Sequence, residues 1–313
     1  MTIAGKRLEF RIPISPSEGF FSQVRLYNYA LRRLGPPYDQ ARLLVVVGDN
    51  CDIDSVRREN RWSEGFNVVW ERVPDAIFNE FGMWGTANWR LNIPAQDAEI
   101  VFLSDADTVL LRDVNPLLAD FPISEPTVRG HMAHGPPPSD GTDAPPSYTP
   151  EFWPWLFDQF NVDWPSETYN YSMDFFRALP KVPAYYNLGF VAMNAAALPI
   201  FDAQIVETAR RIKTLTESHM RCQIAVTIIA HRAAMNIAAL PSEYNAANDL
   251  GHLKVNGLRV DDIRVLHYLR GDEIDRSTIA LPGKIAEFLT RTLRNPANSA
   301  LQRLVRDYWE SLR

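Results

Sequence analysis

A short apolar run that ends in two carboxylates is the feature that most constrains this chain. Residues 100–104 read Ile-Val-Phe-Leu-Ser, and Asp105 and Asp107 follow with only the small Ala106 between them. Alternate side chains of an extended segment point to the same side, so the two carboxylates project together and Ala106 leaves their approach open. Oxygen ligands in this arrangement suit a divalent cation such as Mn²⁺ or Mg²⁺. The alternative is a polar turn after a core strand.

Strand-like and helix-like segments alternate through the first 115 residues. Strands are expected over residues 8–14, 43–47, 66–73 and 100–104, and helix-like segments over residues 22–34, 52–64 and 79–95. The continuous apolar run at 43–47 is typical of a strand that is buried on both faces. We therefore predict an α/β fold with a Rossmann-like, mixed but mainly parallel sheet flanked by helices. Ligands of such sheets bind beyond the carboxyl ends of the strands, where Asp105 and Asp107 lie.

The middle of the chain, residues 122–183, has a different composition. It holds more than half of the 23 prolines and a dense set of aromatic side chains from Tyr148 to Phe176. We predict a loop-rich insertion within a single domain spanning 1–313. It would lie on the side of a site where a carbohydrate acceptor binds, or act as a lid. Most of its aromatic rings are expected to form a satellite core, with one or two lining a sugar site.

Regular segments return after the insertion. In the strand expected over residues 185–194, Asn187 and Gly189 interrupt an apolar run, and a glycine within a strand often marks the close approach of a ligand or another backbone. Helices are expected over 199–215 and 222–234, a short strand over 263–266, and terminal helices within 283–313. His267 directly follows the short strand.

Composition argues against several classes of function. The formal charge of −6 disfavours nonspecific nucleic-acid binding. No apolar run reaches the length of a membrane span, and the polar start lacks a signal-peptide core, so no transmembrane segment is expected. Cys51 and Cys222 are the only cysteines, which predicts a reducing, cytoplasmic location without a disulfide framework. The arginines of residues 291–313 allow peripheral contact with an anionic membrane, the alternative being a solvated helix face.

Several residues follow the chain order of one enzyme family. They are Arg90 before the acidic strand, Asp105-Ala106-Asp107 at its end, Asn187-Leu188-Gly189, Gln223 at a helix start, the segment Leu240–Asn245 and the late His267. In these residues the chain resembles nucleotide-sugar glycosyltransferases of the GT-A fold, above all glycosyltransferase family 8, the group of glycogenin and the lipopolysaccharide galactosyltransferases. The resemblance covers residues 8–118 and 184–272.

The chain departs from the family pattern at three places. Leu188 stands where the family has a serine, and Cys222 stands where it has an acid. After His267 the family continues to a glycine and then Lys-Pro-Trp, whereas here Arg270 and Gly271 follow and no Lys-Pro-Trp exists. These departures bear on donor identity and stereochemistry and not on a metal-diphosphate site.

The resemblance implies metal-dependent transfer of a hexose from a nucleoside-diphosphate sugar, expected to be a UDP-sugar, with retention of configuration. Asp105, Asp107 and His267 would hold Mn²⁺ (or Mg²⁺), which acts as a Lewis acid on the leaving diphosphate. Arg90 would stabilise the same oxygens electrostatically, and Arg270 would replace the absent lysine.

Other residues are assigned to the donor and the reaction through the same resemblance. The donor-binding set is Ile14, Ser15, Arg90, Asp105, Ala106, Asp107, Gly189 and Arg270. Within it, Ile14 and Ser15 would hold the base and the ribose. Asn187 and Gln223 would lie near the sugar or the attacking hydroxyl, where Gln223 could stabilise an oxocarbenium-like transition state. The acceptor, whether saccharide, glycolipid or protein, is left open, and no carboxylate is assigned as nucleophile or base.

Two other functions stay open at this point. Residues 105–109 also fit the start of haloacid-dehalogenase-like phosphatases, in which the first aspartate is the nucleophile and Mg²⁺ the cofactor. Lys254 and the pair Asp261–Asp262 follow, as such enzymes require, but the pair precedes a strand instead of following one. A complete βαβ region before the motif also fits that family badly. The remaining alternative is a catalytically silent sugar-nucleotide-binding protein on the same fold.

Overall fold

The computed structural model describes residues 5–139 and 144–313 and contains ten strands and eleven α-helices in those ranges. The strands are β1 (Leu8–Ile14), β2 (Arg42–Val47), β3 (Val68–Arg72), β4 (Ile100–Ser104), β5 (Thr108–Leu110), β6 (Thr127–Met132), β7 (Tyr186–Asn194), β8 (Asn236–Ala239), β9 (Ala246–Ala247) and β10 (Val265–His267). The helices are α1 (Glu18–Arg32), α2 (Ile53–Glu59), α3 (Asp75–Phe81), α4 (Met83–Trp89), α5 (Asn115–Ala119), α6 (Phe152–Gln159), α7 (Leu198–Leu215), α8 (Arg221–Arg232), α9 (Leu250–Val255), α10 (Pro282–Thr290) and α11 (Pro296–Ser311). Four short 3₁₀ turns complete the elements: η2 (Arg61–Gly65), η3 (Asp174–Phe176), η4 (Ser242–Tyr244) and η5 (Val260–Asp262).

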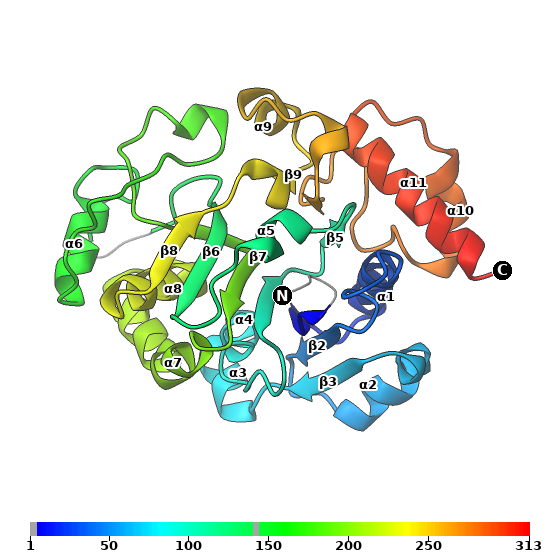
Figure 1. Cartoon of the computed structure of the whole chain (residues 1–313), viewed down its shortest axis with the longest axis horizontal. Helices are drawn as coiled ribbons and strands as arrows, with labels where there is room; N and C mark the ends of the chain where they lie inside the picture. Colours follow the sequence, from blue (N-terminus) through cyan, green and yellow to red (C-terminus); the bar gives the residue numbers. More distant parts are fainter. Residues whose placement is uncertain (1–4, 140–143) are drawn as a thin grey trace.

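Two sheets organise these elements. The larger has the strand order β3-β2-β1-β4-β7-β6-β8, and the smaller has the order β5-β10-β9. Pairing is parallel from β3 through β4 and between β6 and β8, while β7 runs antiparallel to both of its neighbours. Helices lie on either side of the large sheet (Figure 1). The predicted mixed, mainly parallel α/β fold is confirmed, and β2 is buried over Leu43–Val47 as its apolar run predicts.

Local chemistry moved two helix boundaries away from their expected places. The helix predicted to start at residue 22 begins at Glu18, because the Ser17 side chain caps it by accepting a hydrogen bond from the Phe20 amide. The helix-like segment predicted over residues 79–95 is two short helices, α3 and α4. Gly82 separates them with a φ of +60°, a backbone conformation that ends a helix and favours glycine.

The stretch 122–183 is not an insertion throughout, since it contributes β6 to the large sheet between β7 and β8. The aromatic helix α6 follows later and lies at one end of the molecule, opposite α10 and α11 (Figure 1). Its buried side chains Phe152, Trp153 and Phe157 pack in the same core as β7 and α8, so they extend the main core and do not form a satellite. Part of the expected lid, residues 140–143, lies outside the described residues.

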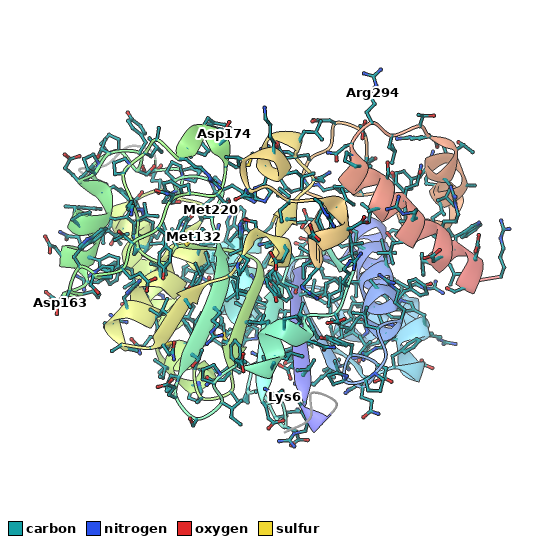
Figure 2. All side chains as sticks on the ribbon, turned by 45° about the horizontal axis from the view of Figure 1, so that its top comes forward. Lys6, Met132, Asp163, Asp174, Met220 and Arg294 are labelled. Carbon is teal, nitrogen blue, oxygen red and sulfur yellow. The ribbon has the colours of Figure 1, made fainter. Side chains whose placement is uncertain are left out.

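The two ends of the strands in the large sheet have different surroundings. Lys6 lies just before β1, at the end where the parallel strands begin, whereas Asp174 of η3 and Met220 lie toward the opposite end (Figure 2). At that opposite end β1 and β4 finish and β7 begins, because β4 and β7 are antiparallel with Ser104 paired to Phe190. Among the described residues, no helix is both long and apolar enough to span a bilayer.

Candidate metal and nucleotide site

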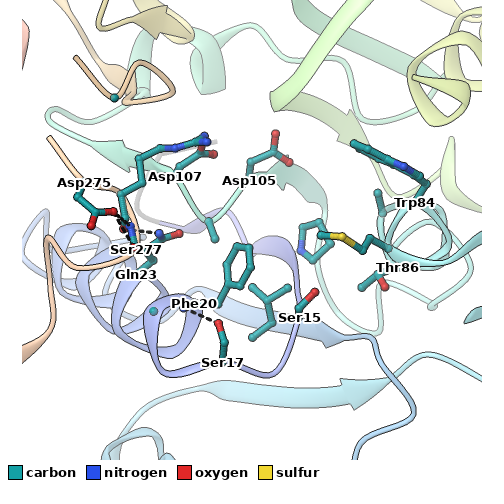
Figure 3. Close-up of a pocket in the computed structure, with 18 of the residues that line it drawn as sticks. Ser15, Ser17, Phe20, Gln23, Trp84, Thr86, Asp105, Asp107, Asp275 and Ser277 are labelled. Carbon is teal, nitrogen blue, oxygen red and sulfur yellow. Dashed lines mark hydrogen bonds and ion pairs between the residues drawn. The ribbon is translucent and has the colours of Figure 1, made fainter. Parts of the chain in front are cut away.

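A cavity of about 750 Å³ opens at the carboxyl ends of β1 and β4. Its walls come from the β1–α1 loop, α1, α4, the acidic turn after β4 and the segment that follows β10. The lining residues are Pro13, Ile14, Ser15, Ser17, Gly19, Phe20, Gln23, Met83, Trp84, Thr86, Ala87, Asp105, Ala106, Asp107, Gly271, Ile274, Asp275, Arg276 and Ser277. Figure 3 shows Trp84 and Thr86 on one side, with Gln23, Asp275 and Ser277 on the other. The volume of the cavity falls in the range of sites for small molecules and cofactors.

The acidic turn after β4 is held by backbone hydrogen bonds from several elements. The Asp105 carbonyl accepts from the Thr108 amide at 3.2 Å, which closes the turn. The Asp105 amide donates to the Gly189 carbonyl at 3.3 Å, and the Tyr268 amide donates to the Asp107 carbonyl at 2.9 Å. The turn is therefore fastened to both β7 and the end of β10, and its two carboxylates face the cavity (Figure 3).

His267 reaches Asp107 through the pairing of the small sheet. β5 and β10 are antiparallel with His267 opposite Thr108, the residue that follows Asp107. The His267 Nε2 atom lies 3.2 Å from Oδ1 of Asp107. One ligand atom each from Asp105, Asp107 and His267 lie within 4.8 Å of one another, and no other group of three or more His, Cys, Asp or Glu side chains in the described ranges meets this geometry. The structure thus brings together the three predicted metal ligands.

The charges in this group are strongly coupled. Burial acts to raise the pKa of Asp107, but His267 and Arg276 overcome that effect and lower it to about 2. Burial acts to lower the pKa of His267, but the Asp107 carboxylate raises it above its usual value. Asp107 is therefore a carboxylate at neutral pH, as a ligand for a divalent cation must be.

A second set of contacts orients His267. Its Nδ1 atom lies 3.1 Å from Oδ1 of Asn245, an oxygen that can only accept, so Nδ1 donates to Asn245 and Nε2 is the nitrogen that faces Asp107. The Asn245 amide donates in turn to Oδ1 of Asn187 at 3.0 Å, and that oxygen also accepts from the Gly189 amide at 2.8 Å. Such a chain of contacts fixes the ring orientation that a metal-binding histidine needs.

Gly189 makes room for this arrangement. A Cβ atom at position 189 would lie 2.5 Å from Nδ1 of His267 and 2.8 Å from Oδ1 of Asn187. Real Cβ contacts are essentially never shorter than 3.0 Å, so any side chain here would push the imidazole or the amide out of place. The sequence predicted the close approach of a ligand or another backbone at this glycine, but the group that approaches it in the structure is the side chain of His267.

Arg90 lies beneath the site and does not line the cavity. Its side chain is 1% exposed and directly follows α4. The guanidinium donates to the Ser104 carbonyl at 2.8 Å and lies 3.4 Å from Oδ1 of Asp105. A buried cation at this place orients Asp105 and offsets its charge. Burial raises the pKa of Cys222 at the start of α8, while the nearby charges of Arg90 and Asp105 act on it in opposite directions.

The remaining predicted residues occupy different surroundings. Ile14, Ser15 and Ala106 line the cavity. The Gln223 side chain donates to the Met220 sulfur at the start of α8 and is not among the lining residues. The Arg270 guanidinium donates to Asp249 at 3.1 Å, and it too lies outside the lining.

Arg276 is the cation that faces the cavity, and the sequence reasoning missed it. Its guanidinium donates to Oδ2 of Asp107. The family pattern has a lysine after the glycine that corresponds to Gly271, and Arg276 stands five residues after Gly271 in this chain. Asn245 was also missed as a site residue, although its segment had been matched.

The phosphatase alternative finds no support in this arrangement. Lys254 on α9 and the pair Asp261–Asp262 of η5 are exposed. None of them belongs to the group formed by Asp105, Asp107 and His267 or to the lining of the cavity. The residues that a phosphatase of that family would need beside its aspartates are therefore not assembled here.

Comparison with known proteins finds similarity in fold and not in sequence. No family model and no curated protein matches the chain. The apo structure of the WbbM bifunctional glycosyltransferase matches with a TM-score of 0.55 and 14% identity, over 97% of this chain and 52% of that one. Mouse xyloside xylosyltransferase 1 matches with a TM-score of 0.48 and 14% identity, over 84% of this chain and 97% of that one. The chain thus spans about half the length of WbbM, with which it shares a fold.

Proposed function

We propose that this protein is a metal-dependent glycosyltransferase that moves a hexose from a nucleoside-diphosphate sugar to a saccharide, glycolipid or protein acceptor. The observation that carries the proposal is the group of Asp105, Asp107 and His267 on the edge of a cavity large enough for a sugar nucleotide. The fold shared with WbbM supports it. Membership of glycosyltransferase family 8, a UDP-sugar donor, retention of configuration and a cytoplasmic location belong to the same proposal.

The donor set fits a hard divalent cation. Two carboxylates and one imidazole offer the oxygen and nitrogen ligands that Mn²⁺ accepts, and Gly189 leaves the space in which His267 stands. When bound, such a cation supplies Lewis-acid stabilisation of a leaving diphosphate. Asp105, Asp107 and His267 would hold it, with Asn245 keeping the histidine in the required tautomer.

The other residues of the site have roles that their positions support. Ile14, Ser15 and Phe20 line the cavity where the base and ribose would lie. Arg90 acts through Asp105, which it contacts from below, and is therefore a positioning residue. Asn187 acts in the same way through Asn245 and His267. A role for Gln223 near the sugar remains part of the proposal, and Gln223 lies at the start of α8, next to Cys222.

Thermal stability tests the metal and nucleotide site without knowledge of the acceptor. The melting temperature is measured with UDP, GDP or ADP, each with and without Mn²⁺, for the wild type and Asp107→Asn. A ligand that binds only the folded state adds roughly 2.7 kcal/mol to the free energy of unfolding at a hundredfold excess over its Kd, and so raises the melting temperature. We expect one nucleotide to stabilise the wild type only with Mn²⁺, and Asp107→Asn to lose that shift.

Release of nucleotide from the matching sugar nucleotide, with and without candidate acceptors, then separates an enzyme from a silent binding protein. A shift without turnover would favour the binding protein. No shift with any of the three nucleotides would reject the proposed donor site.

A further inference from the structure

Arg276 and His267 contact different oxygen atoms of the Asp107 carboxylate. Oδ1 of Asp107 faces His267 at 3.2 Å, and Oδ2 accepts from the Arg276 guanidinium. Both oxygens of the central ligand therefore already have cationic or hydrogen-bonding partners. A metal ion that takes an Asp107 oxygen has to compete with these partners, since a guanidinium and a divalent cation repel each other at such short range.

Hydrogen bonds hold the backbone around Arg276, whereas its side chain is half-exposed and has one acidic partner among the described residues. The backbone carbonyl of Arg276 accepts from the Gln23 side chain of α1. Next to it, the Ser277 amide and hydroxyl donate to Asp275 at 3.0 Å and 2.6 Å. The Arg276 side chain itself is 47% exposed and lines the cavity, and Asp107 is the one acidic partner recorded for it in the described chain. The backbone is anchored on both sides, and one ion pair restrains the guanidinium.

The charge balance around the cavity indicates where the guanidinium goes. Arg90 is buried beneath Asp105 and Arg270 pairs with Asp249, so neither lines the cavity. Among the described residues that line the cavity, Arg276 is the only arginine or lysine. A diphosphate in this cavity carries several negative charges, and a guanidinium binds phosphate oxygens through paired hydrogen bonds. Arg276 thus has two alternative anionic partners, Asp107 and the ligand.

We propose that Arg276 couples metal binding to diphosphate binding, by pairing with Asp107 when no diphosphate is present and with the diphosphate when it is. This inference rests on the proposed function. Paired with Asp107, Arg276 weakens binding of the metal alone. Released to the diphosphate, it frees Asp107 for the metal and adds a contact to the ligand. Each ligand then favours binding of the other, as linkage requires.

Titration of Mn²⁺ without any nucleotide gives the decisive test. The free Mn²⁺ concentration is followed by electron paramagnetic resonance for the wild type and Arg276→Gln. Because coupling between sites is typically 5- to 150-fold, we expect Arg276→Gln to bind Mn²⁺ at least about fivefold more tightly than the wild type. The nucleotide among UDP, GDP and ADP that stabilises the wild type should bind Arg276→Gln more weakly than it binds the wild type.

Two variants serve as controls. Arg259→Gln makes the same change of charge at an exposed arginine paired with Asp262, and should leave both affinities unchanged. Arg276→Lys keeps the charge and should restore part of the coupling. Mn²⁺ affinity in Arg276→Gln that equals or falls below the wild-type value would overturn the coupling role while leaving the proposed function intact. If the wild type bound neither Mn²⁺ nor a nucleotide, both would be rejected together.

Discussion

At the scale of single residues, the site depends on a glycine, Gly189, because no side chain fits at its position. Gly189 lies in β7 with its Cα next to the His267 ring, and an added Cβ would overlap the ring and the Asn187 side chain. These are the two groups at either end of the contact chain through Asn245. The absence of a Cβ therefore sets the position of His267, a proposed metal ligand 78 positions further along the chain.

We expect Gly189→Ala to weaken Mn²⁺ binding by about 10- to 100-fold, the loss that follows when the supporting contacts of a metal-binding histidine are disturbed. The measurement is a Mn²⁺ titration, with circular dichroism to verify that the fold is retained. Gly283→Ala is the matched control, because no atom lies within 4 Å of the Cβ it would add. Wild-type affinity in Gly189→Ala would contradict the steric argument.

At the scale of elements, the proline- and aromatic-rich stretch is part of the core as well as part of the rim. β6 is an inner strand of the large sheet, and α6 packs onto the core that includes β7 and α8. Phe157 of α6 lies with its ring centroid 5.3 Å from that of His231 on α8. α6 is therefore packed as part of the core.

Leu156→Ala tests whether α6 is anchored. Leu156 is fully buried, and removing its side chain should lower the free energy of unfolding by about 2–5 kcal/mol, through lost burial and a remaining cavity. The measurement is urea unfolding. Phe175→Ala, at a ring that is 68% exposed, should change stability by no more than about 0.5 kcal/mol. Similar small effects of both substitutions would mean that α6 is a loosely attached lid.

At the scale of the whole molecule, burial lowers the pKa of four histidine rings. The pKa of His131 falls to about 3, those of His231 and His252 fall to about 4, and that of His134 falls well below the ordinary value of 6.5. The unfolded chain binds protons at these rings below pH 6.5, whereas the folded chain does not. The contribution of these rings to stability is therefore complete above pH 6.5 and is lost as the pH falls toward 4.

His231→Phe should flatten this dependence. The ring nitrogen Nε2 of His231 is buried without a partner, so phenylalanine keeps the packing against Phe157 and removes one titrating group. Between pH 6 and pH 5 we expect the loss of unfolding free energy to shrink by about 1 kcal/mol per pH unit, close to the limit for one proton. Urea unfolding at both pH values measures it. An unchanged slope would show that His231 already titrates in the folded protein.

Local pattern determined a large part of this protein. The bounds of β1 and β4, the buried run of β2 and the position of the acidic pair follow from short apolar segments and their polar ends, which act within a few residues. The motif order also predicted His267 as a third metal ligand, and the structure brings its ring to Asp107. These features depend on side-chain periodicity and on a known order of motifs, both of which can be read along the chain.

Tertiary structure decided which other groups surround the ligands. Arg276 reaches Asp107 across 169 positions, and Asn245 reaches His267 because β9 and β10 pair in parallel, with Ala246 next to Leu266. Sequence spacing favoured Arg270, but its guanidinium pairs with Asp249. Such contacts depend on strand register, on the path of an irregular segment and on which charges the folded backbone leaves unpaired. These are properties of the assembled sheets, and no short window of residues contains them.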